Sequence, residues 1–183
     1  MILSLFRKDP QRDAAEALFA AAVEQARRPD FYTDLGVEDS VDGRFELLAL
    51  HVYLVLRRLK SAGSAAGLSQ HLLDAMFANL DGALREMGVG DLSVARKIRK
   101  MAEAFYGRIG AYEAALAPTA AAAALDAALL RNVYNGTTGK AAALSAYVRR
   151  ASAGLDGQKA GRIEAGILAF PSPLSADAPR EAP

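Results

Sequence analysis

The stretch LREMGVGDLSVARKIRKMAEAFYGR, residues 84–108, decides the fold of this chain. An apolar pattern of helical period stops at Gly88, a residue that can adopt the left-handed conformation in which many helices end. A second pattern begins at once, with Asp91 as the expected N-cap and Ser93 as the alternative. Two long helices joined by so short a turn should form an antiparallel hairpin.

The helices on either side of this turn have well-defined apolar faces. In the second one, apolar residues recur at steps of three or four: Ile98, Met101, Phe105, Ile109, Tyr112 and Leu116. The helix before it, expected over residues 68–87, has the same spacing. Upstream, a helix over residues 43–60 with Ser40 or Asp42 as its cap is apolar around more than half its circumference. It should therefore lie at the centre of the fold.

Helical period extends over most of the remaining sequence. Asp9 and Pro10 mark the start of a first helix, which Pro29 ends, and a short helical turn should follow. Further helices are expected in three places: after Pro118, from the cap Thr138 to Gly154, and over residues 158–168. We find no convincing strand and no internal repeat. The sequence predicts an all-α chain of six or seven helices.

The domain organisation follows from where the large apolar residues end. Residues 1–170 should form a single helical domain, more irregular than an ideal bundle. Residues 171–183 contain too few large apolar side chains to bury and are predicted to be a disordered tail.

Composition restricts the function classes. The chain has 183 residues, a formal net charge of +1 and no cysteine, which excludes disulfides, thiolate zinc sites and any global basic field for nucleic acid. Its strongest apolar run, residues 47–56, is shorter than a transmembrane segment, which needs about 20 residues. The opening MILSLF places apolar residues ahead of basic ones, the reverse of a secretory signal. We expect a cytoplasmic protein that can touch a membrane surface.

Four cations gather in the first half of the helix that follows the turn: Arg96, Lys97, Arg99 and Lys100. They lie away from the apolar seam or flank it, and we call this set the basic ridge. The simpler interpretation is a solvated helix face on which Glu103 pairs with Arg99. The sharper hypothesis is a docking surface for an acidic or anionic partner, whose affinity would fall with salt. Because no aromatic residues alternate with these cations to stack bases, DNA is not an expected partner.

His51 and Tyr53 lie in the most apolar helix. We expect His51 to be a core side chain with a hydrogen-bond partner. The alternative is a pocket beside His51 and Tyr53 that binds a quinone or a lipid-like small molecule.

A metal site is the third alternative. His71, Asp74 and Asp81 share a helix face at spacings that helix-bundle carboxylate sites use. Such sites need further carboxylates from facing helices, and the available Glu86 and Glu103 lie off the apolar stripes. We therefore expect a solvated polar face with no metal and no cofactor, and a metal-dependent enzyme remains the competing hypothesis.

Three stretches stand out together by order and spacing: GRFELLALHVYLVLRRL (43–59), LLDAMFANLDGALREMGVGDLSVARKIRKMAEAFYGR (72–108) and ALLRNVY (128–134). They resemble the ubiquinol–cytochrome c chaperone family, over about residues 31–150. The mitochondrial members carry a leader and an apolar amino-terminal segment, whereas this chain has only MILSLF and so resembles a bacterial member.

This resemblance implies a non-enzymatic assembly factor for respiratory complex III. The factor would bind newly made cytochrome b or another complex III subunit, and the family has no catalytic residues to carry over. Mitochondrial relatives also associate with the ribosome. The basic ridge could accordingly meet ribosomal RNA, an anionic membrane surface or acidic loops of the client protein.

Overall fold

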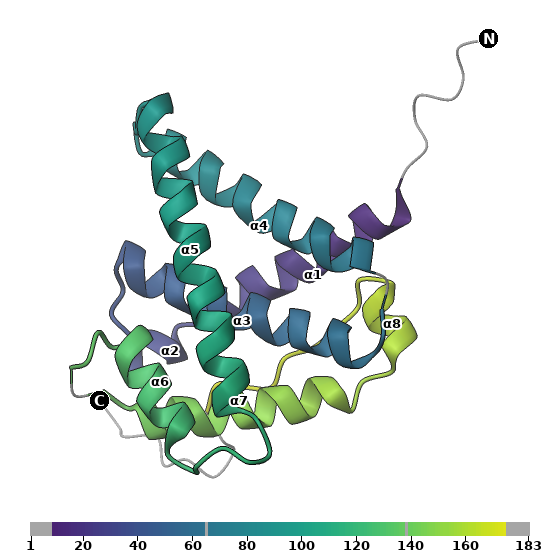
Figure 1. The fold of residues 1–183 in the computed structure, drawn as a ribbon, viewed down its shortest axis with the longest axis vertical. Coiled ribbons are helices and arrows are strands. Elements are labelled where there is room, and N and C mark those ends of the chain that lie inside the picture. Colours follow the sequence, from purple (N-terminus) through teal and green to yellow (C-terminus); the bar gives the residue numbers. More distant parts are fainter. Residues whose placement is uncertain (1–8, 65, 138, 175–183) are drawn as a thin grey trace.

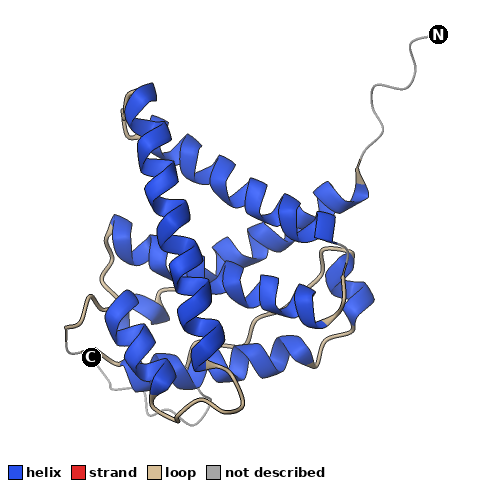
Figure 2. Ribbon diagram, viewed as in Figure 1, coloured by secondary structure: helices blue, strands red, loops and turns tan. Residues whose placement is uncertain are grey.

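The computed structural model describes residues 9–64, 66–137 and 139–174, and this part of the chain contains helices and no strand (Figures 1 and 2). Eight helices follow one another: α1 (Pro10–Ala26), α2 (Asp30–Thr33), α3 (Val41–Ser61), α4 (Ala66–Glu86), α5 (Asp91–Ala115), α6 (Ala124–Asn132), α7 (Ala141–Asp156) and α8 (Ala160–Glu164). The all-α prediction is confirmed. The count exceeds the expected six or seven because the short α2 is a separate helix.

Helix α3 is the centre of the molecule, as its apolar circumference predicts. It contacts α1, α4, α5, α7 and α8, and in Figure 1 it crosses the middle of the fold. The cap is Ser40, whose Oγ accepts a hydrogen bond from the Gly43 amide at 3.1 Å. The alternative cap, Asp42, lies within the first turn, where a carboxylate favours the helix dipole.

The turn between α4 and α5 is a Schellman motif. Gly88 has φ +79°. Its amide donates to the Arg85 carbonyl oxygen at 2.9 Å, and the Val89 amide donates to the Leu84 carbonyl oxygen at 3.1 Å. The predicted hairpin is confirmed, but its two arms diverge from the turn like the sides of a V (Figure 1).

Asp91 is not the cap of α5. Gly90 holds that position without a side-chain hydrogen bond, and Asp91 is the first helical residue. The Asp91 carboxylate instead pairs with Arg85, which also contacts Asp81 with Nε and Oδ2 2.6 Å apart. One arginine thus ties the two arms together at the turn.

The later helices differ from prediction at their ends. Helix α6 begins at Ala124, not near Pro118, because the alanines that precede it offer no large side chain to bury. Helix α7 continues past Gly154, where an added Cβ would meet nothing within 4 Å, to Asp156. Helix α8 covers only part of residues 158–168, and Thr138 lies outside the described residues.

Residues 165–174, here called the closing segment, run back along the molecule. The Pro171 carbonyl oxygen accepts a hydrogen bond from Gln25 Nε2 of α1 at 2.9 Å, and the Pro173 carbonyl oxygen accepts one from Arg150 Nη2 of α7, also at 2.9 Å. Pro173 is buried. The rest of the predicted tail, residues 175–183, lies outside the described residues, as does MILSLF.

Candidate functional site

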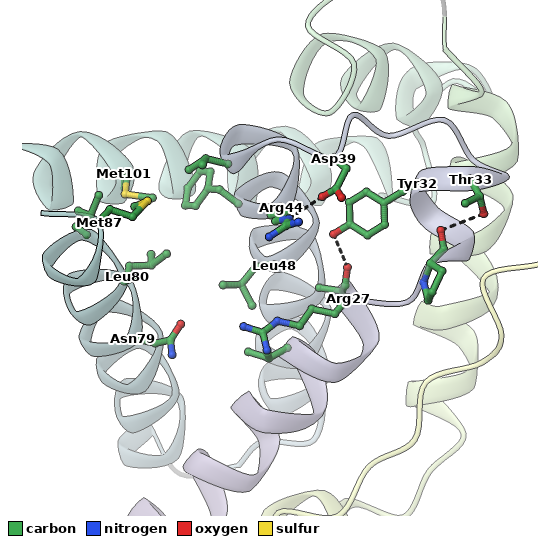
Figure 3. Close-up of a pocket in the computed structure, with 17 residues that line it drawn as sticks. Arg27, Tyr32, Thr33, Asp39, Arg44, Leu48, Asn79, Leu80, Met87 and Met101 are labelled. Atoms are coloured by element: carbon green, nitrogen blue, oxygen red, sulfur yellow. Dashed lines mark hydrogen bonds and ion pairs between the residues drawn. The ribbon is translucent and has the colours of Figure 1, made fainter. Parts of the chain in front are cut away.

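The diverging arms of the hairpin leave a groove above α3. Its volume is about 650 Å³, and α1 to α5 all contribute to its walls. The larger apolar side chains that line it are Val23, Val41, Phe45, Leu48, Leu80, Leu84, Met87 and Met101. In Figure 3, Met87 and Met101 stand at one end of the groove, and Tyr32 and Thr33 stand at the other.

The groove is apolar although parts of its rim are open to water. Val41 is 60% exposed and Met87 is 54% exposed, whereas Leu48 and Leu80 on the floor are buried. Large side chains that are both apolar and accessible mark a binding surface when they line a concave site. Flexible methionine side chains adapt to occupants of different shape.

Polar groups gather at the α2 end of the groove. Arg44 Nε lies 2.6 Å from Asp39 Oδ1, and this hydrogen bond lowers the pKa of Asp39. The Tyr32 hydroxyl donates to the Ala26 carbonyl oxygen at 3.0 Å, and burial raises the pKa of Tyr32. Arg27 also lines the groove, and in Figure 3 its side chain extends toward the side of Asn79. Its guanidinium forms no ion pair within the described chain. An occupant would meet apolar walls, polar groups at the α2 end and the cation of Arg27.

Sequence reasoning did not find this groove. Its lining residues come from five helices and the segment between α2 and α3, and only the tertiary arrangement brings them together. One local signal existed, since Met87 continues the apolar stripe of α4 up to the turn, where little remains to cover it.

His51 is a buried core histidine, as expected. Its Nδ1 lies 2.7 Å from the Leu47 carbonyl oxygen, and its Nε2 lies 2.7 Å from the Tyr147 hydroxyl oxygen. Because a carbonyl oxygen only accepts, Nδ1 carries the proton and Nε2 accepts from Tyr147. Tyr147 in turn accepts from Gln25 Nε2 at 3.0 Å. Burial lowers the pKa of His51 from 6.5 to about 4, so the ring is neutral at pH 7.

Tyr53 points away from this network. Its hydroxyl donates to Glu113 Oε2 at 2.9 Å, and burial raises its pKa. Neither His51 nor Tyr53 lines the groove. The groove is therefore not the pocket that the sequence suggested beside these two residues.

A buried ion pair joins α3 to α5 and was not predicted. Glu46 is 6% exposed, and its two carboxylate oxygens contact Nε and Nη2 of Arg108, the first at 2.6 Å. The Arg108 guanidinium also lies over the Phe45 ring, 5.8 Å from its centroid. Burial raises the pKa of Glu46, and Arg108 opposes this shift. The sequence feature that could have indicated this pair is Glu46 itself, an acidic residue within an apolar helix.

The basic ridge is exposed along α5. All four of its side chains, Arg96, Lys97, Arg99 and Lys100, are accessible. None forms an ion pair with another residue that the structure describes, and the expected pair between Arg99 and Glu103 is not observed there. None of the four side chains lines the groove, so the ridge and the groove use different residues of α5.

The three residues of the metal hypothesis have other partners. His71 Nε2 lies 3.2 Å from Asp9 Oδ2, Asp74 accepts a hydrogen bond from Gln70, and Asp81 pairs with Arg85. Among residues 9–64, 66–137 and 139–174, no three His, Cys, Asp or Glu side chains are grouped to hold a metal ion. In the same ranges, no helix has the length and hydropathy to cross a bilayer.

Comparisons with known proteins agree with this architecture. The family model for the ubiquinol–cytochrome C chaperone matches residues 33–170. A curated relative from Xenopus laevis, ubiquinol-cytochrome-c reductase complex assembly factor 1, is 26% identical over 123 residues. The match covers 67% of this chain and 60% of that relative. The crystal structure of the Cbp3 homolog from Brucella abortus is similar with a TM-score of 0.80 and 36% identity, covering 94% of this chain and 98% of that one.

Proposed function

Because the chain belongs to the ubiquinol–cytochrome c chaperone family, we propose that it assists assembly of ubiquinol–cytochrome c reductase, complex III, by binding newly made cytochrome b. The observation that carries this proposal is the family match over residues 33–170, which includes the central helix and both arms of the hairpin. Binding without catalysis is the activity we assign to it.

The groove is the place where we expect the client to bind. An apolar segment of cytochrome b would bury the Val41 and Met87 side chains, and the cation of Arg27 would attract an acidic group of the client. Burying two such side chains contributes about 1.5–3 kcal/mol each at most. Helix-in-groove recognition uses surfaces of this kind.

The first experiment removes the gene and measures assembled complex III. We expect reduced complex III, and we expect cytochrome b to co-purify with the tagged wild-type protein. Normal complex III together with no associated cytochrome b would contradict the proposal.

A second experiment assigns binding to the groove. Val41→Asp with Met87→Asp places charges on two exposed groove residues, so folding should be retained while cytochrome b capture is lost. Ile167→Asp is the matched control, because Ile167 is 49% exposed and does not line the groove. Equal capture by both variants would place the client elsewhere.

The basic ridge is the second surface that we assign to a partner. Its exposure and its lack of ion pairs within the described chain support contact with ribosomal RNA, an anionic membrane surface or acidic client loops. Charge reversal at Arg96, Lys97 and Lys100 should leave folding intact and abolish association that weakens with salt. Unchanged association at low salt would show that the ridge is only solvated surface.

We further propose that the protein works in the cytoplasm at the periphery of the inner membrane.

A small hydrophobic ligand is the second candidate for the groove. The volume of about 650 Å³ lies within the range of small-molecule sites, and its apolar walls with one polar end suit a quinone or a lipid. Native mass spectrometry of the purified protein would detect such a ligand. A protein that retains no added mass after purification from membranes would contradict this candidate.

A further inference from the structure

The turn of the hairpin ends in exposed apolar side chains. Leu92, in the first turn of α5, is 93% exposed, and Met87, at the end of α4, is 54% exposed. Figure 1 shows that the junction of α4 and α5 stands at a far corner of the helical body. We call residues 87–92 the hairpin tip. A single exposed leucine is ordinary in proteins, so its meaning depends on what surrounds it.

The basic ridge begins in α5 four residues after Leu92, the last residue of the hairpin tip. Arg96 and Arg99 follow Leu92 by four and seven positions, so they share its helix face. At 1.5 Å per residue they lie about 6 Å and about 10 Å farther along the axis. Lys97 and Lys100 widen the cationic arc within the same two turns. The order along α5 is therefore one apolar side chain and then four cations.

The acidic residues near the tip do not cancel this charge. Asp91 is paired with Arg85, which also holds Asp81. Glu86 is exposed at the end of α4, and Glu103 follows the four cations in the sequence of α5. Of the six charged residues between 86 and 100, four are the basic ridge and two are acids. The tip and ridge together carry a net positive charge.

We propose that the hairpin tip docks on an anionic lipid surface, with Leu92 entering the acyl boundary and the basic ridge at the depth of the lipid phosphates. This order of apolar and cationic groups matches the polarity gradient of a membrane interface. Phosphate-rich RNA would satisfy the cations and leave Leu92 in water. An acidic protein loop would not require the apolar residue to be outermost.

This inference names one partner for the basic ridge and does not depend on cytochrome b. Met87 belongs both to the tip and to the end of the groove, as Figure 3 shows. A protein docked by its tip would therefore hold that end of the groove close to the bilayer.

Vesicle flotation tests the contribution of the basic ridge to membrane binding. The wild-type chain should float with vesicles of phosphatidylcholine containing phosphatidylglycerol and not with phosphatidylcholine alone. The variant Arg96→Gln with Lys100→Gln should bind roughly 30-fold more weakly, from about 1 kcal/mol per cation at an anionic surface. The pair Lys159→Gln with Arg162→Gln removes the same charge near α8 and should change binding little.

A single tryptophan tests the insertion of Leu92, since the natural sequence contains none. The fluorescence of Leu92→Trp should shift to shorter wavelength with anionic vesicles and be quenched by brominated acyl chains. Ile167→Trp, at a position beyond α8 that is 49% exposed, should show neither effect. Leu92→Ser should weaken flotation roughly tenfold, from the loss of one buried apolar side chain.

Three results would overturn the proposal. The first is flotation that is equal for the ridge variant and the α8 control. The second is an unshifted Leu92→Trp spectrum in bound protein, because cations alone would then mediate binding. The third is loss of ribosome or protein association by the ridge variant while vesicle binding stays intact. Circular dichroism and melting temperature of each variant separate these results from misfolding.

Discussion

His51 and Glu46 are both buried in α3, and each is stabilised in a different way. His51 is neutral and hydrogen-bonded at both ring nitrogens, to Leu47 and Tyr147. Glu46 is paired with Arg108 across to α5. Sequence reasoning predicted that His51 needs a partner because a buried polar group is costly without one. It did not identify Tyr147, because 96 positions separate the two residues.

The pKa of His51 makes stability depend on pH. The unfolded chain takes up a proton at His51 near the ordinary pKa of 6.5, whereas the folded protein does so near about 4. Stability is therefore full above pH 6.5 and falls as the pH drops toward 4. From pH 7 to pH 5 we expect a loss of about 2 kcal/mol from this group, measured by urea unfolding.

The variant His51→Gln isolates this effect. Glutamine keeps a donor and an acceptor but does not titrate, so the variant should be less stable at pH 7 and show a shallower fall toward pH 5. A fall as steep as in the wild type would assign the pH dependence to other groups.

The ion pair between Glu46 and Arg108 should be costly to break from one side. Arg108→Ala leaves the Glu46 carboxylate buried without its partner, and we expect a loss of about 3 kcal/mol in the free energy of unfolding. Glu46→Leu combined with Arg108→Met removes both charges and should recover a large part of that loss. If the losses of the single variants Glu46→Leu and Arg108→Met simply add in the double variant, the side chains are not coupled.

At the scale of elements, the turn from α4 to α5 depends on one backbone conformation. Gly88 has φ +79°, which side chains other than glycine adopt at a cost. Gly88→Ala should therefore destabilise the protein by about 1–2 kcal/mol. Gly82→Ala, six residues earlier inside α4 with no atom within 4 Å of its added Cβ, should instead stabilise by about 0.5–1 kcal/mol. Thermal unfolding checks this prediction: the melting temperature should fall for Gly88→Ala and rise for Gly82→Ala. Shifts in the same direction would contradict it.

The elements were predictable to the extent that local rules determine them. The Asp9 cap, the Ser40 cap and the Gly88 stop each depend on a few adjacent residues, and each is observed. The predicted boundaries of α6, α7 and α8 were wrong, and at the end of α7 a tertiary contact is the reason. Helix α7 passes Gly154 since Arg58 of α3, buried beneath it, donates from Nε to the Leu155 carbonyl oxygen at 2.8 Å and caps its end.

At the scale of the whole molecule, the last described segment of the chain packs against the first helix, α1. The closing segment crosses α1, where Gln25 contacts Pro171. Phe170 lies edge-on to His51 with ring centroids 5.2 Å apart. No periodicity predicts such a contact, because it joins an irregular segment to a helix almost the whole chain away. The groove was unpredictable for the same reason.

Gly166 is where the closing segment approaches α1 most tightly. It has φ +82°, and a Cβ there would lie 3.0 Å from Ala14 Cα and from the Ala17 methyl. Gly166→Ala should destabilise by about 2–4 kcal/mol, from backbone strain together with overpacking. Gly161→Ala, inside α8 with open space around it, is the control and should be tolerated. Equal denaturation midpoints for the two variants would show that this approach is unimportant.

The contact between Gln25 and the closing segment also sets an order of events during synthesis. A ribosome releases α1 before it makes the closing segment that packs against α1. Until residues near Pro171 have emerged from the ribosome, Phe170 cannot pack against His51. The hydrogen bond between His51 of α3 and Tyr147 of α7 is then not covered by the closing segment. This part of the fold is therefore completed only after translation has passed α8.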